Sequence, residues 1–130
     1  MREIGRQRAV RWIAVLSWAA VIFAMSSIPG SGLPAGRYAT LAHFLEYALL
    51  AALLYTALRL DLSAGRALAI AVIVASAYGF TDEVHQAFVP MRTPDPVDWV
   101  VDTLGATAGA GAAWFLERSV SARQKNRETP

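Results

Sequence analysis

Four long apolar stretches, separated by short polar segments, dominate the pattern of this chain. The separating segments 29–37, 59–66 and 89–96 are rich in Pro, Gly and Asp, which break helices and favour turns. A hydrocarbon core about 30 Å thick needs roughly 20 helical residues, or somewhat fewer where end residues snorkel. The pattern therefore predicts an all-α protein, a four-helix transmembrane bundle forming a single domain over residues 1–130. The expected spans are about 12–28, 41–60, 66–88 and 97–117.

Composition supports this interpretation. Of the 130 residues, 55% are hydrophobic and only 17% are charged, well away from the mixture typical of a soluble domain. The chain has no cysteine, which excludes disulfides, thiolate chemistry and cysteine-ligated metal centres. The arginines flank apolar stretches and form no basic stripe interleaved with aromatic residues, so we expect no nucleic-acid partner.

The placement of Lys and Arg predicts the orientation of the bundle. Ten basic residues lie in the two terminal segments and the middle connection, whereas Arg37 and Arg92 lie in the other two connections. The positive-inside rule then places both termini in the cytoplasm and residues 78–90, "YGFTDEVHQAFVP", toward the outside. We expect a multi-pass protein of the bacterial cytoplasmic (inner) membrane. A cleaved signal peptide over residues 1–26 is an alternative, but its apolar core is long for one and cleavage would leave three spans.

Polar side chains interrupt the pattern at the outer ends of three spans. Only about 15 residues, or about 22 Å of helix, separate Arg66 from Asp82, so the acids after Phe80 should lie near the outer hydrocarbon boundary. A carboxylate at that depth is expected to face the bundle interior. The sequence thus predicts one outward-opening polar pocket. Its candidate ligand-binding residues are His43, Glu46, Tyr47, Asp82, Glu83, Gln86, Arg92, Asp98 and Asp102.

Structural explanations compete with this hypothesis for each residue taken singly. Asp98 follows Pro96 and can start a helix by interacting with the helix dipole. His43 can be a hydrogen-bonded histidine of the bundle, and Asp82 with Glu83 can be solvated at the interface. The small-residue run "GATAGAGAA" (105–113) favours close helix packing inside the bundle over dimerisation. Three polar groups at one depth nevertheless favour a functional pocket.

Three segments of the chain resemble the VanZ-like family of small integral membrane proteins, named for a teicoplanin-resistance protein of glycopeptide-resistant bacteria. They are "MSSIPG" (25–30), "HFLEY" (43–47) and "DEVHQAFVPMRTPDPVDWVVDTLG" (82–105), and the resemblance covers about residues 10–117. Two positions depart from the family pattern: Asp102 stands where Asn is usual, and Thr40 where a basic residue is frequent. Both departures make the expected pocket more acidic and favour a cation over an anionic ligand. The resemblance implies a role in the cell envelope, with an effect on glycopeptide (teicoplanin) susceptibility.

The residues leave three functions open. The first is a protein without catalytic activity that binds a cell-wall precursor or lipid headgroup, with Arg92 on an anionic group. The second is a membrane-embedded, metal-dependent enzyme on a lipid-linked substrate, for which the chain offers no recognised catalytic motif. The third is a small ion or proton transporter, although the inner halves of the spans are apolar. We favour the first, with catalysis undecided.

Cofactors and partners are only partly constrained. A divalent cation is the one cofactor that the acids suggest, with His43, Asp82, Glu83 and His85 as candidate ligands, but the spacing specifies no known site. The expected partners are the lipid bilayer and an envelope component. A homo-oligomer is left open.

Overall fold

The computed structural model describes residues 2–30 and 36–128. In these residues the regular structure is entirely helical, which confirms the all-α class and the four helices predicted from the sequence. The helices are α1 (Arg2–Ser26), α2 (Arg37–Leu58), α3 (Ala64–Gln86) and α4 (Pro96–Glu128).

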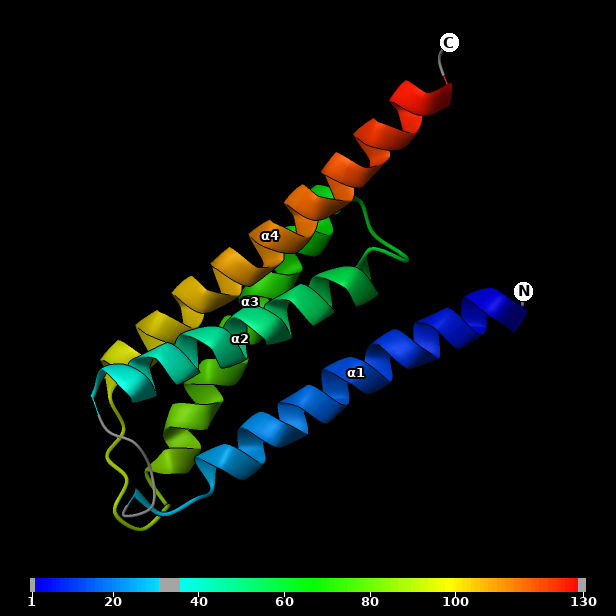
Figure 1. Ribbon diagram of the computed structural model, residues 1–130. Helices are drawn as coiled ribbons and strands as arrows, with labels where there is room; N and C mark the ends of the chain where they lie inside the picture. The colour runs from blue at the N-terminus through cyan, green and yellow to red at the C-terminus, as the bar shows by residue number, and fades with distance from the viewer. Residues whose placement is uncertain (1, 31–35, 129–130) are drawn as a thin grey trace.

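The helices run alternately up and down, so that both chain termini lie at the same end of the molecule (Figure 1). We call this the terminal end, and it also holds the connection between α2 and α3. At the opposite end, the loop end, α1 leads into α2 and α3 leads into α4 (Figure 1). Residues far apart in the sequence, at the end of α3 and the starts of α2 and α4, therefore meet at the loop end.

Three of the helices, α1, α2 and α3, are long and apolar enough to cross a membrane. The 22 residues of α2 give a helix about 33 Å long, close to the thickness of a hydrocarbon core. The fourth helix does not reach the same hydropathy, because it is rich in Gly, Ala and Thr over residues 105–113 and also carries Asp98, Asp102 and Glu117. A fourth crossing therefore remains a prediction.

Two helices extend well beyond the apolar stretches of the sequence. α1 begins at Arg2, and α4 continues to Glu128, about ten residues past the apolar part of each. The added turns are rich in Arg, Lys and Gln, which favour helix, and their described side chains are exposed. The helix bounds consequently do not mark where a membrane would begin or end.

Small residues let α2, α3 and α4 approach closely. On α3, Ala67, Ala71 and Ala75 recur every four residues along one face and are fully buried. On α4, Gly109 lies so close to α2 that an added Cβ would stand 1.8 Å from the carbonyl oxygen of Ala48. A Cβ at Gly105 would likewise stand 2.3 Å from the carbonyl oxygen of Phe44. The packing expected of the 105–113 run is thus present between helices of the bundle.

The first helix is attached to the others by side-chain hydrogen bonds to backbone carbonyls. The indole of Trp18 donates to the carbonyl of Glu46 on α2 (2.9 Å), and the hydroxyl of Tyr78 on α3 donates to the carbonyl of Ala19 (2.8 Å). These bonds hold the second half of α1 against the bundle. Toward its N-terminus α1 separates from α3 and α4 (Figure 1) but stays bound to the end of α2, where the Arg11 guanidinium donates to the carbonyl of Thr56.

Charged side chains link the helices at the terminal end. Arg59, just after α2, pairs with Glu117 of α4, which also accepts a hydrogen bond from the hydroxyl of Tyr55. Arg8 of α1 pairs with Asp61 in the connection between α2 and α3. These pairs are partly or largely exposed, so each is worth at most about 1 kcal/mol.

We expect Gly109→Ala to lower the free energy of unfolding by about 1–3 kcal/mol, because the new methyl group meets the backbone of α2 and must push the helices apart. Gly111→Ala is the matched control, since nothing lies within 4 Å of its added Cβ. Thermal unfolding of the purified chains in detergent micelles measures both. Equal stability of the two variants would contradict the close approach of α2 and α4.

Candidate functional site

The polar residues singled out in the sequence gather at the loop end on three helices. His43, Glu46 and Tyr47 lie in the first turns of α2, and Asp98 and Asp102 in the first turns of α4. Asp82, Glu83 and Gln86 end α3. Because α3 runs toward the loop end while α2 and α4 run away from it, the three groups lie at a common depth.

A buried pair between His43 and Asp102 joins α2 to α4. The His43 Nδ1 and the Asp102 Oδ1 lie 3.0 Å apart, the Asp102 residue is fully buried, and His43 is 8% exposed. With Asp102 ionised, Nδ1 donates the hydrogen bond, because a carboxylate only accepts. The other ring nitrogen, Nε2, faces the Asp98 carboxylate at 3.9 Å. The imidazole is thus held between two acids of α4.

A glycine makes room for the buried acid. A Cβ at Gly79 of α3 would stand 3.0 Å from Asp102 Oδ2 and 3.2 Å from Cε1 of the Tyr47 ring. The Tyr47 ring and the Asp102 carboxylate therefore both border the space that Gly79 leaves open. Neither Asp102 Oδ2 nor the Tyr47 hydroxyl has a hydrogen-bond partner among the described residues.

The two acids of α3 have different surroundings. Glu83 Oε2 accepts a hydrogen bond from the backbone N–H of Asp95 (2.8 Å), which ties the start of α4 to α3, while Glu83 Oε1 has no partner among the described residues. Asp82 Oδ2 accepts a hydrogen bond from the side-chain amide of Gln86, one turn later on the same helix (3.1 Å). Glu83 lies near His43 and Asp102, whereas Asp82 lines a neighbouring cavity.

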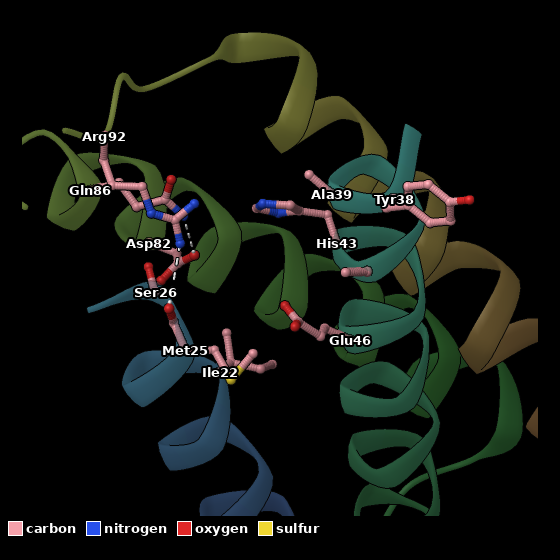
Figure 2. A pocket seen from close by; sticks show the side chains of 11 residues that line it. Ile22, Met25, Ser26, Tyr38, Ala39, His43, Glu46, Asp82, Gln86 and Arg92 are labelled. Carbon is pink, nitrogen blue, oxygen red and sulfur yellow. Dashed lines mark hydrogen bonds between the residues drawn. The ribbon is translucent and has the colours of Figure 1, made fainter. Parts of the chain in front are cut away.

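A cavity of about 140 Å³ lies between the end of α1, the start of α2 and the end of α3. In Figure 2, Arg92, Gln86 and Asp82 line one side of it, and His43 and Glu46 face them from α2. Its lining residues are Ile22, Met25, Ser26, Tyr38, Ala39, Ala42, His43, Glu46, Asp82, Gln86 and Arg92.

Arg92 brings a positive charge to this cavity. Its NH2 nitrogen donates a long hydrogen bond to the carbonyl of Met25 (3.4 Å), and its buried Nε has no partner among the described residues. The loop that carries Arg92 is fixed against the end of α1, since the Gly30 N–H donates to the carbonyl of Pro90 (3.2 Å). A Cβ at Gly30 would stand 1.9 Å from the Met91 carbonyl oxygen, so this contact requires glycine.

His85 lies apart from the other candidates. Its Nε2 is 3.0 Å from the hydroxyl of Ser27, and its ring centroid is 4.5 Å from that of Phe23. It thus contacts the end of α1 and does not line the cavity. Among the described residues, the donor atoms that come close enough to share a metal ion are those of His43, Glu83 and Asp102. The ligand set suggested by the sequence therefore differs from this grouping, because it includes Asp82 and His85 and lacks Asp102.

Ser26 and Gly79 border the polar groups of the site but are not among the candidates predicted from the sequence. Ser26 is 4% exposed, lines the cavity and has a hydroxyl without a partner among the described residues. Gly79 was hidden in the apolar stretch of α3. The only signal for Ser26 was its place in "MSSIPG", and a lone glycine inside an apolar helix gives no signal of its own.

Comparison with known proteins gives one finding. A family model described as VanZ/LLP1 matches residues 10–117, which is most of the chain and includes every residue of the site. Neither the curated proteins nor the solved structures gave a match.

Proposed function

The chain belongs to the VanZ/LLP1 family, and we propose that it is a membrane protein of the cell envelope that binds a polar headgroup in its loop-end cavity without transforming it. The observation that carries this proposal is the cavity itself, a space of about 140 Å³ lined by one guanidinium and two carboxylates.

The lining predicts the chemistry of the ligand. The unpartnered Nε of Arg92 offers a charged donor to an anionic group such as a phosphate. Glu46 and Asp82 offer acceptors to an ammonium or hydroxyl group. A headgroup that carries an anionic group and a hydrogen-bond donor in one small unit can bind both the guanidinium and the carboxylates. A lipid phosphate that carries an amine or a sugar is such a headgroup.

The position of the cavity suits a lipid-linked ligand. It lies between the end of α1 and the start of α2 (Figure 2), whose outward faces present exposed apolar side chains such as Phe23, Leu41 and Leu45. A headgroup in the cavity would leave its hydrocarbon chains beside these faces and inside the bilayer. A cell-wall precursor on a lipid carrier and a phospholipid share this chemistry.

In our proposal all four helices cross the cytoplasmic membrane and the loop end faces outward. Three apolar helices support the membrane location. The low hydropathy of α4 is compatible with crossing, because Asp102 is buried against α2 and α3 and does not face lipid. The terminal end carries most of the basic residues, as the positive-inside rule requires of a cytoplasmic side.

Because the chain has no cysteine, single introduced cysteines report this orientation directly. We expect Thr93→Cys, in the exposed connection to α4, to react with a membrane-impermeant maleimide on intact cells or right-side-out vesicles. Ala122→Cys, near the C-terminus, should react only after permeabilisation. The reverse labelling pattern would place the cavity in the cytoplasm and contradict an extracellular ligand.

The functional proposal is tested by labelled teicoplanin bound per cell in a susceptible Gram-positive host. We expect the wild-type chain to lower teicoplanin binding and Arg92→Ala to abolish this effect. Loss of a charge-assisted hydrogen bond of about 1.5–3 kcal/mol weakens ligand binding about tenfold or more. Arg123→Ala, in the exposed last turns of α4, is the control that removes the same charge elsewhere. At matched membrane levels, full activity of Arg92→Ala would refute the role of the cavity, and no effect of the wild type would refute the link to glycopeptides.

A further inference from the structure

A second group of polar atoms lies beside the cavity, where α2, α3 and α4 meet. His43, Glu83 and Asp102 each offer one donor atom, and these three atoms all lie within 4.8 Å of one another. Each residue comes from a different helix, and each is at least 92% buried. The three donors therefore surround a single point inside the bundle.

Two residues of this group and the neighbouring Tyr47 carry polar atoms without a partner. Asp102 Oδ2 and Glu83 Oε1 have no hydrogen-bond partner among the described residues, and the same holds for the hydroxyl of Tyr47, which is fully buried. The Tyr47 ring and Asp102 Oδ2 both border Gly79. Buried polar atoms are almost always hydrogen-bonded, and leaving one without a partner costs about 1–3 kcal/mol. Two of the three residues in the group thus carry a carboxylate oxygen without a partner, which indicates a ligand that satisfies them.

The charges indicate a cation. Glu83 and Asp102 are buried, and Asp98 lies 3.9 Å from His43 Nε2. Within residues 2–30 and 36–128, the ion pairs of these acids are with His43 alone. One imidazole compensates at most one negative charge, so the remaining buried carboxylates need either a proton or a second positive partner.

We propose that His43, Glu83 and Asp102 bind one divalent first-row metal ion such as Zn²⁺ or Mn²⁺. One imidazole and two carboxylates suit these ions better than Mg²⁺, which prefers oxygen ligands alone. Metal–ligand bonds of about 2.1 Å hold neighbouring donors about 3–4 Å apart, so the side chains need to contract only slightly from their present separation. Three protein ligands leave a coordination position open, and His43 also lines the cavity, so the ion adjoins the proposed headgroup site.

This site does not depend on the proposed headgroup binding. Arg92, Glu46 and Gln86 line the cavity but contribute no donor atom to the three-residue group. The metal can therefore bind in an Arg92→Ala variant, and a failure of the glycopeptide experiment leaves the metal site untouched.

Metal content of the purified full chain in detergent tests the proposal. The protein is first treated with a chelator, then given Zn²⁺ or Mn²⁺ alone, desalted, and measured by inductively coupled plasma mass spectrometry. We expect about one ion per wild-type chain. Glu83→Gln and Asp102→Asn keep the side-chain volume but remove an anionic ligand, and each should lower the metal content at least about tenfold. His85→Gln and Glu46→Gln are matched controls outside the group and should retain the ion.

Thermal unfolding provides a readout that also covers variants with reduced stability. Because an ion that binds only the folded state stabilises it, added metal should raise the Tm of the wild type and of the two controls but not of Glu83→Gln or Asp102→Asn. If Asp102→Asn does not fold, Glu83→Gln and the wild type decide the question. A wild-type chain that retains less than about a tenth of an ion and shows no Tm shift would overturn the proposal, as would full retention by the folded ligand variants.

Discussion

The buried pair of His43 and Asp102 is the interaction on which the loop end of this protein depends. It joins residues 59 positions apart and places a carboxylate inside the bundle, where a charge without a partner would be strongly destabilising. The short Asp102 side chain reaches α2 only because Gly105 and Gly109 allow α4 to lie directly on the backbone of α2. On the side of α3, the missing side chain of Gly79 leaves space for the Asp102 carboxylate. Three glycines on two helices thus set the position of one acid.

The same arrangement positions both sites. His43 holds Asp102 with Nδ1 and borders the cavity, so the proposed metal group and the proposed headgroup cavity share one imidazole. Glu83 fixes the start of α4 through the backbone of Asp95, and Gly30 fixes the loop that carries Arg92. In our proposals, the acidic group binds a cation and the neighbouring guanidinium binds an anionic headgroup. This explains why polar residues end an apolar helix in "TDEVHQAFVP".

The sequence predicted most of the fold, because apolar stretches of membrane length, broken by Pro and Gly, have few alternatives to helices. It also indicated which polar residues would meet, since alternating helices bring the ends of 41–60, 66–88 and 97–117 to a few common depths. It could not predict side-chain partners. The proximity of Glu83 to His43 and Asp102, and the position of His85 against Phe23, depend on helix rotation and on close approach at glycines. The sequence also could not predict where α1 begins and α4 ends, because basic residues continue each helix past its apolar part.

A double-mutant cycle on His43 and Asp102 tests the central claim most directly. The free energy of unfolding would be measured for the wild type, His43→Ala, Asp102→Ala and the double variant, in detergent with a chelator present to exclude metal. Removing one partner leaves the other buried alone, so we predict that each single substitution costs about 3 kcal/mol and that the double costs less than their sum by about 1 kcal/mol or more. Strictly additive costs would show that the two residues do not interact in the folded protein, and would contradict the arrangement on which both sites rest.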